Sequence, residues 1–243
     1  MVATSDVTGT ARPLRVLVTS TYFEPGFRGG GPVRSVARIL DSAADGIAAT
    51  LVTGARDLGA ARCYPGLSGR WVARGRTAVF YLDVRHPGHW WRLLRSLRGT
   101  VFDLLYVNSL WAPFSIAPIV ASTLGLLRVR QILIAPRGEC SAGALSLKAR
   151  KKRLFLAGWN RLLRRRQVRW HASTEREAAD IRRLFPWARV EVNQNQSDLP
   201  TVATPPPPRS QPAGRDGPAR LVFVGRIAPM KNLAAVLEAL ALV

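Results

Sequence analysis

The chain has 243 residues, 47% of them hydrophobic, which is enough to bury the core of one large domain or two modest ones. Its two cysteines, Cys63 and Cys140, give no disulfide framework and no metal-site spacing, and residues 1–16 lack the pattern of a secretory signal, so a reducing cytosol is expected. The formal net charge of +21 indicates an anionic partner.

Short runs of β-branched and apolar residues recur along the chain, and segments of helical character follow most of them. The expected strands cover residues 15–20, 49–54, 77–82, 104–109, 131–136, 168–173 and 190–193. The expected helices cover residues 33–44, 89–98, 113–127, 145–165 and 175–184. This alternation predicts an α/β fold with a Rossmann-like, doubly wound parallel sheet and helices on both faces. Residues 57–76 are expected to form a loop or small excursion.

A membrane span is the alternative interpretation of residues 104–127, which contain no charged residue and are long enough to cross a bilayer. However, polar residues and two prolines interrupt this run, which divides naturally into a strand, LLYVNS, and a helix, FSIAPIVASTLGLL. Buried parallel strands are also continuously apolar, so the strand and helix are favoured.

Three glycines, Gly29, Gly30 and Gly31, separate the first expected strand from a helix that begins near Pro32 or Val33. Backbone N–H groups at such a helix start can approach a phosphate, which the positive end of the helix dipole attracts. The spacing is not G-x-G-x-x-G, which argues against an ordinary dinucleotide site, and a plain flexible loop remains an alternative. The position beyond a strand's carboxyl end favours a ligand site.

Basic residues are concentrated between positions 128 and 169, where 13 of them accompany one acid, Glu139. Arg137 follows the fifth expected strand, where it could pair with a phosphate or carboxylate. The next helix combines an apolar stripe with basic residues, Lys148, Arg150, Lys151, Lys152, Arg161, Arg164 and Arg165. These are either the solvated face of a core helix or a surface for anionic lipid. Nucleic acid is not expected, because no recognition motif accompanies the charge.

His171 lies on the sixth expected strand, just before the turn, and is either a satisfied buried histidine or a weak catalytic candidate beside Arg137. Ser173 is expected to cap the following helix, with Glu175 and Glu177 in the first turn, where the helix dipole favours acids. No Ser-His-Asp order and no His-Glu-x-x-His spacing appears, so hydrolase and metalloenzyme interpretations have no specific support.

The alternation of elements ends after Asn193. Residues 196–219 contain seven prolines, four of them consecutive, which is typical of an extended linker. We therefore expect one domain at residues 1–195 and the first strand and helix of a second at residues 220–243. Arg226 and Lys231 flank the turn of this βα unit, and two cations at a helix start can bind a diphosphate leaving group.

Together these segments resemble family 4 glycosyltransferases, whose GT-B fold has two Rossmann-like domains facing each other across a cleft. The similarity covers most of the chain: TYFEPGFRGGGPVRSVARIL resembles the family's glycine loop, IAPRGECSAGALSLKARKKRL its PRGML segment, HASTEREAADIRRLFP its HATSE segment, and FVGRIAPMKNL the opening of its C-terminal domain. The last segment is the most telling, because the proline-rich linker falls at the family's hinge.

The resemblance implies an enzyme of bacterial cell-surface polysaccharide biosynthesis. It would move a sugar from a UDP- or GDP-linked donor to a glycan or lipid-linked acceptor, with a retaining outcome and without a metal or cofactor. It also implies that Gly29, Gly30 and Gly31 face the donor phosphates and that Arg226 and Lys231 bind the donor diphosphate. A cytoplasmic location follows, with peripheral attachment to the inner face of the plasma membrane as an option.

One element of the family pattern is missing. The Glu-x7-Glu motif, which contacts the donor sugar and ribose in the family, would lie beyond residue 243, so the second domain is expected to be truncated. The alternative function is an inactive fragment that binds an acceptor or an anionic membrane through residues 128–169.

Overall fold

A computed structural model of the chain describes residues 12–146, 149–194, 221–224 and 232–242, with the side chains of residues 146 and 149–154 left out. The chain divides into two units, Met1–Gln196 and Ser197–Val243. The linker expected at residues 196–219 lies outside the described residues.

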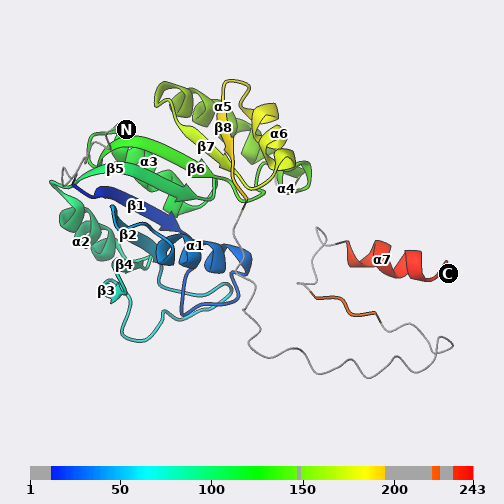
Figure 1. The fold of residues 1–243 in the computed structure, drawn as a ribbon, viewed down its shortest axis with the longest axis horizontal. Coiled ribbons are helices and arrows are strands. Elements are labelled where there is room, and N and C mark those ends of the chain that lie inside the picture. The colour runs from blue at the N-terminus through cyan, green and yellow to red at the C-terminus, as the bar shows by residue number, and fades with distance from the viewer. Residues whose placement is uncertain (1–11, 147–148, 195–220, 225–231, 243) are drawn as a thin grey trace, which may run out of the picture. The chain divides into compact units, whose positions relative to one another are not determined.

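The first unit is an α/β fold built on one eight-stranded sheet (Figure 1). Its strands are β1 (Leu14–Ser20), β2 (Ile47–Gly54), β3 (Trp71–Arg74), β4 (Thr77–Leu82), β5 (Val101–Asn108), β6 (Arg128–Ala135), β7 (Arg169–Ala172) and β8 (Arg189–Val192). They are ordered β3-β4-β2-β1-β5-β6-β7-β8, and all neighbours are parallel except β3 and β4. This open, mostly parallel sheet is compatible with the predicted Rossmann-like fold.

Six helices of the described residues accompany this sheet: α1 (Gly31–Asp41), α2 (Pro87–Leu97), α3 (Pro113–Thr123), α4 (Ala142–Ser146), α5 (Ala149–Arg165) and α6 (Glu175–Leu184). Proline stands in the first turn of α1, α2 and α3, where its missing N–H costs no helical hydrogen bond. Buried side chains of α1 pack on one face of the sheet, and those of α2, α3, α5 and α6 on the other.

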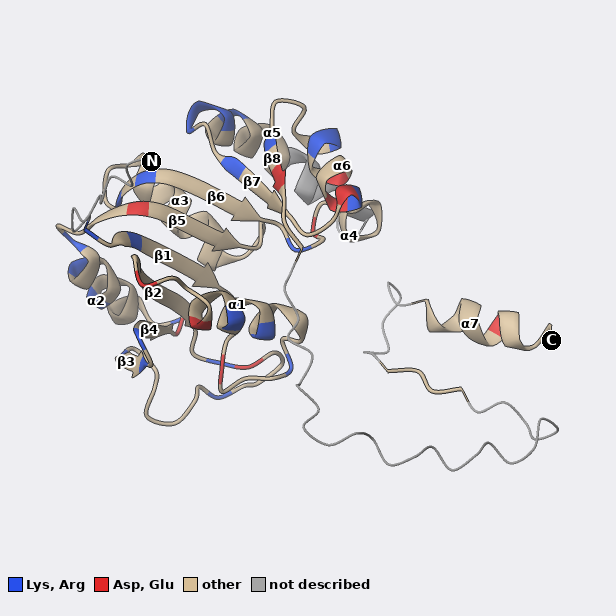
Figure 2. Cartoon of the chain, in the orientation of Figure 1, with Lys and Arg blue, Asp and Glu red and all other residues tan. Residues whose placement is uncertain are grey.

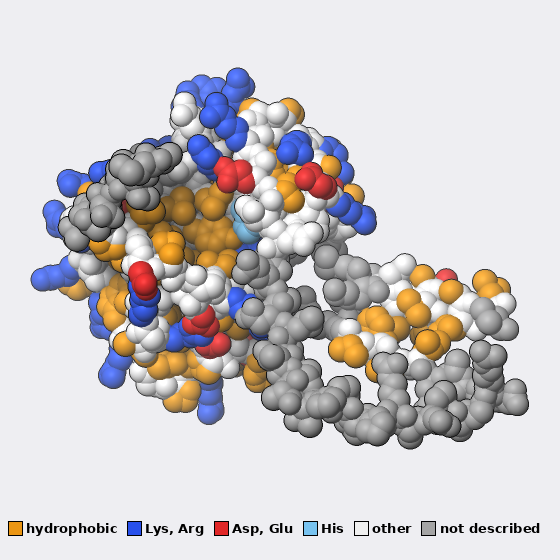
Figure 3. All heavy atoms as spheres, viewed as in Figure 1, with side chains coloured by type: hydrophobic (Ala, Val, Ile, Leu, Met, Phe, Trp, Pro, Cys, Tyr) orange, Lys and Arg blue, Asp and Glu red, His pale blue; other side chains and the backbone are white. Residues whose placement is uncertain are grey.

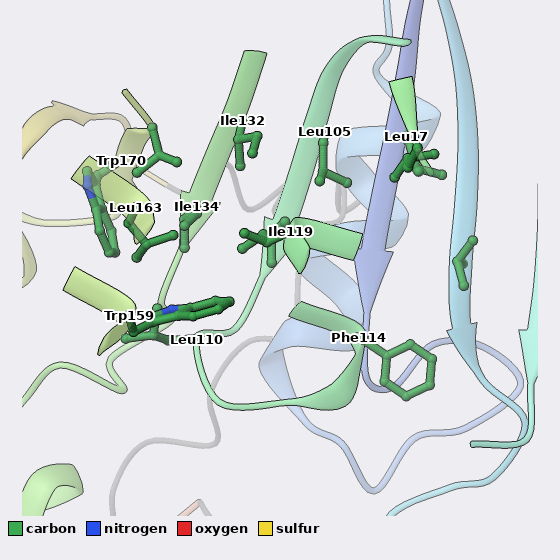
Figure 4. Close-up of a cluster of buried hydrophobic side chains, with 14 of the residues drawn as sticks. Leu17, Leu105, Leu110, Phe114, Ile119, Ile132, Ile134, Trp159, Leu163 and Trp170 are labelled. Atoms are coloured by element: carbon green, nitrogen blue, oxygen red, sulfur yellow. The ribbon is translucent and has the colours of Figure 1, made fainter. Parts of the chain in front are cut away.

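The larger core lies between the sheet and α2, α3, α5 and α6 (Figure 4). Side chains alternate between the two faces of each strand, so Leu17 and Leu105 enter this core while Val18 and Tyr106 belong to the core under α1. Trp170 is fully buried and stacks on Phe185 with 4.6 Å between ring centroids. Helix α5 contributes Trp159 and Leu163, which confirms its predicted apolar stripe.

Three local predictions need correction. Residues 57–76, expected to form a loop or small excursion, include strand β3, which pairs antiparallel with β4. In place of a helix that starts at residue 145, the helical residues begin at Ala142, with α4 before and α5 after residues 147–148, which lie outside the described residues. Thr174, and not Ser173, caps α6, since its hydroxyl accepts a hydrogen bond from the Glu177 N–H at 3.1 Å.

The apolar run at residues 104–127 forms most of β5 and all of α3, as the strand-and-helix interpretation predicts. Among the described residues, we find no helix with the length and apolar character needed to cross a bilayer.

In the second unit, residues 221–224 have no regular secondary structure, in contrast to the strand expected there. A strand needs a hydrogen-bonded neighbour to be stable, and these four residues have none among the described strands. Helix α7 (Leu233–Leu240) forms where a helix is expected.

The assignment of the core predicts a contrast between Leu→Ala at a buried position and Leu→Ala at an exposed one. Leu105→Ala removes a side chain with 0% exposure and should lower the free energy of unfolding by about 2–5 kcal/mol. Leu126→Ala is the control, because this side chain is 61% exposed and its loss should cost less than about 0.5 kcal/mol. Urea denaturation followed by tryptophan fluorescence measures both, and equal destabilisation would contradict the assignment of the core.

Candidate functional site

The candidate site lies at the edge of the sheet where the parallel strands β1, β5, β6 and β7 end. Ser20 at the end of β1 pairs in register with Asn108 of β5, and Asn108 pairs with Ala135 of β6. Arg137 follows β6 by two residues, and His171 is on β7. The shared edge therefore brings together the two catalytic candidates, which are 34 positions apart in the sequence.

Arg137 is held by two side chains of β5. Its Nη2 donates to the Asn108 Oδ1 at 2.8 Å and to the Tyr106 hydroxyl at 3.0 Å, and its Nε donates to the same Asn108 oxygen at 3.1 Å. The Asn108 amide is fixed in turn, because its Nδ2 donates to the Thr19 carbonyl at 3.2 Å. These bonds orient a positive charge beyond the carboxyl ends of the strands.

Tyr106 joins Arg137 to His171. The His171 Nε2 lies 2.9 Å from the Asn193 carbonyl oxygen, which can only accept, so in neutral His171 this nitrogen carries the proton. The Nδ1 then accepts from the Tyr106 hydroxyl, 2.8 Å away. Burial raises the pKa of Tyr106 above its ordinary value of 10, although neighbouring Arg137 acts in the opposite direction, so the phenol keeps its proton at neutral pH.

The backbone is unusual at two positions of this edge. Ser109 and Arg137 follow adjacent strands, and both have left-handed φ angles, 127° and 55°. Non-glycine residues reach such conformations at a cost of about 1–3 kcal/mol each, and they are concentrated at ligand and active sites. This strain therefore supports the assignment of a functional site.

Two carboxylates hold these strained segments in place. Glu139 accepts from the Ser109 hydroxyl at 2.9 Å and from the Leu110 N–H at 2.5 Å. Glu177, only 8% exposed, accepts from the Gly138 N–H at 2.7 Å and from the Ser173 N–H at 2.8 Å. Their oxygens accept from backbone N–H groups and serine hydroxyls, which assigns both acids a positioning role.

The glycine loop follows β1 at the same edge, and α1 begins at Gly31. A Cβ at Gly29 would lie 2.6 Å from the Cβ of Tyr22, so only glycine fits there. Gly30 is the N-cap residue with φ 73° and ψ −141°, a conformation that is nearly exclusive to glycine. No side chain caps α1, and the space above Gly30 and Gly31 is open, so their backbone is accessible to a ligand.

Asp57 ties this loop to the segment after β2. Its Oδ2 accepts from the N–H groups of Phe27 and Arg28 at 3.1 and 3.2 Å. Partial burial raises the pKa of the Asp57 carboxyl, but three backbone donors outweigh this effect and hold the pKa below its ordinary value of 3.8. The loop is therefore tethered by a carboxylate that is ionised at neutral pH.

An apolar groove runs along the α1 face of the sheet towards Tyr106 and His171. It has a volume of about 500 Å³, and Val16, Leu104 and Leu133 are among its walls. Figure 3 shows a hollow lined by hydrophobic side chains on this face. Helices pack on both faces of the sheet, as predicted, but of the first unit's described helices only α1 packs on this one.

The expected basic face is only partly described. Arg161, Arg164 and Arg165 are exposed on α5, and basic residues are dense around its end (Figure 2). Lys148 lies outside the described residues, and Arg150, Lys151 and Lys152 are described by their backbone alone.

Arg226 and Lys231, the expected diphosphate ligands, also lie outside the described residues. No group of three or more His, Cys, Asp or Glu side chains suited to a metal ion occurs in the described parts.

Sequence reasoning missed Tyr106 and Asn108, which connect the site. Their signal was present, because two polar residues two positions apart at the end of an apolar strand point to the same face. The partners of Tyr106, Arg137 and His171, are 31 and 65 positions away in the sequence, and only the pairing of the strands identifies them.

Comparison with known proteins gives no match: no family model, no curated protein and no solved structure matches this chain.

The hydrogen-bond chain predicts the state of His171 and can be tested with Tyr106→Phe. Nitrogen NMR of the imidazole should show the Nε2–H tautomer in the native chain when His171 is neutral. In the variant this tautomer should persist, because Asn193 still accepts, while the Nδ1 resonance moves towards that of a nitrogen without a hydrogen bond. Tyr64→Phe is the matched control and should leave both resonances unchanged. An Nδ1–H tautomer in the native chain would contradict the assignment.

The Asp57 tether has a defined pH dependence. A carboxyl whose pKa is lowered on folding stabilises the folded loop above its unfolded pKa, and this contribution is lost as the pH falls through the folded value. Protection of the Phe27 and Arg28 amides against hydrogen exchange, corrected for intrinsic rates, should be constant at neutral pH and fall below pH 3.8. Asp57→Ala should abolish it at every pH; native-like protection in this variant would refute the tether.

Proposed function

We propose that this chain is a glycosyltransferase of the GT-B class that takes a sugar from a UDP- or GDP-linked donor. The observation that carries the proposal is the strained, hydrogen-bonded Arg137 at the carboxyl edge of a parallel sheet, the edge where α/β proteins bind their ligands. The resemblance of the glycine loop and of the Arg226 and Lys231 segment to the family supplies the substrate class.

In the proposed reaction, the bond between the anomeric carbon and the β-phosphate oxygen breaks. The acceptor hydroxyl forms the new bond to this carbon with retention, and its proton passes to the departing diphosphate. The leaving group gains negative charge, so cations and backbone N–H groups that surround it lower the barrier. We assign this role to Gly29, Gly30 and Gly31 at the start of α1, and the family resemblance implies the same role for Arg226 and Lys231.

Arg137 is suited to bind a second anionic group, such as a phosphate of the acceptor, because its planar guanidinium is already oriented by Asn108 and Tyr106. His171 acts through Tyr106. Its Nδ1 accepts a hydrogen bond from the phenol O–H, so the phenol oxygen is oriented to accept one from the Arg137 N–H. We therefore treat Arg137 as the stronger catalytic candidate and His171 as a positioning residue.

The apolar groove favours a lipid-linked acceptor over a water-soluble glycan. Its walls are mainly aliphatic, while Tyr106 and His171 place polar groups at one end. An acceptor with a hydrocarbon part and a phosphate would contact both regions. Its membrane location would require this chain to work at the cytoplasmic face of the plasma membrane.

The second candidate function is a module that binds an anionic membrane without catalysis. The exposed Arg161, Arg164 and Arg165 favour it. The two functions differ in a simple respect, because a binding module releases no nucleotide from a nucleotide sugar.

The experiment is a screen of UDP- and GDP-sugars with the purified chain, with and without a polyprenyl phosphate acceptor, measuring released UDP or GDP. With the acceptor present, Arg137→Ala should lower the rate with the active donor by about 10- to 100-fold, the scale expected when a charge-assisted hydrogen bond to the acceptor phosphate is lost. Arg85→Ala, which removes an exposed arginine after β4, is the control and should keep full activity. If the native chain neither binds nor turns over any donor, the proposal is refuted. Full activity of Arg137→Ala would refute the assigned site.

A further inference from the structure

A polar hollow lies at the opposite edge of the sheet, where β7 and β8 begin. It has a volume of about 280 Å³ and is lined by Gln131, Arg164, Gln167, Arg169, Trp187 and Arg189. The strands β7 and β8 have four residues each, so about 10 Å separates this edge from the candidate site at their carboxyl ends. The hollow is therefore not part of that site.

Three arginines from three different elements meet at this hollow. Arg169 and Arg189 are the first residues of β7 and β8 and are register partners. Neighbouring strands are about 4.8 Å apart, so these two like charges are held close together, which is unfavourable without compensation. Arg164, near the end of α5, adds a third positive charge.

The described residues compensate only one of these charges. The Arg169 Nη1 lies 2.8 Å from the Glu191 Oε1, whereas no carboxylate in the described part of the chain pairs with Arg164 or Arg189. The negative end of the α5 dipole accounts for Arg164, but it does not account for arginines on two strands.

The other walls of the hollow are suited to an oxyanion. Gln131 and Gln167 supply uncharged amide donors beside the guanidinium groups. Trp187 forms a fixed wall, because its indole N–H donates to the Asn160 Oδ1 at 2.5 Å and its ring packs edge-on against Phe185. Pockets for drug-sized ligands begin at about 300 Å³, so this one suits a small group and not a whole nucleotide.

We propose that this hollow binds a phosphate group, as a phosphomonoester or phosphodiester. Guanidinium groups pair with phosphate oxygens through charge-assisted and frequently bidentate hydrogen bonds. The phosphate belongs either to a lipid headgroup or to a soluble metabolite. Leu124 and Leu126, which are 67% and 61% exposed, lie in the turn before β6 at the same edge, and they would contact the bilayer in the lipid case. The site does not depend on sugar transfer.

The test compares the native chain with the double variant Arg164→Gln/Arg189→Gln. Glutamine keeps a polar side chain and removes the charge. One arm measures sedimentation with phosphatidylcholine vesicles with and without phosphatidic acid, and the other measures calorimetric binding of glycerol 3-phosphate. The double variant should bind at least about tenfold more weakly in whichever arm the native chain binds, since each lost bond is charge-assisted.

Arg62→Gln/Arg85→Gln is the matched control, because it removes two exposed arginines and the same total charge far from the hollow. Thermal unfolding of both double variants verifies that they are folded. Binding in the vesicle arm alone assigns a lipid headgroup, and binding in the solution arm alone assigns a soluble phosphate. Equal weakening by both double variants, or no binding of the native chain in either arm, would overturn the proposal.

Discussion

The candidate site depends on the parallel pairing of β1, β5 and β6. In this register Ser20, Asn108 and Ala135 lie side by side at the end of their strands. Tyr106 and Asn108 then project from one face of β5, and the chain leaving β6 passes above them, where Arg137 reaches both. A shift of one residue in β5 would turn both polar side chains into the opposite core, so the register and the site are specified together.

Glu139 and Glu177 are part of the same arrangement. Left-handed backbone at Ser109 and Arg137 costs free energy. The Ser109 N–H still donates to the Ala135 carbonyl of β6 at 2.9 Å. Glu139 and Glu177 supply further hydrogen bonds to these segments from separate positions in the chain. Hydrogen bonds to a charged partner contribute about 1.5–3 kcal/mol each, which is enough to offset strain of that size. These carboxylates thus act as supports for a cationic centre and not as its reactive groups.

Much of this fold could be predicted from sequence, because parallel strands buried on both faces appear as continuous apolar runs and the helices between them carry an apolar stripe. Strand β3 was missed because it has only four residues and follows a glycine-rich segment. Two hydroxyl residues precede α6, and sequence does not separate them as caps: Thr174 caps the helix, whereas the Ser173 hydroxyl donates to Glu177 at 2.7 Å.

Arg137 and His171 could each be suggested from their positions after strands, whereas their connection through Tyr106 could not. A hydrogen bond between residues 65 positions apart depends on the order of strands across the sheet, which no local pattern encodes. The glycines were recognised by type, but the reason for each differs: Gly29 is required by crowding against Tyr22, and Gly30 by its backbone angles.

The arginine that begins β8 has a further consequence for the solubility of the protein. Strand β8 is at the edge of the sheet, where unpaired backbone groups can recruit a strand from another molecule and start aggregation. Its inward residues Val190 and Val192 pack on the core, while Arg189 and Glu191 are exposed and charged. Charged residues on an edge strand discourage such pairing, so the side chain proposed to bind an anion also disfavours strand pairing between molecules at this edge.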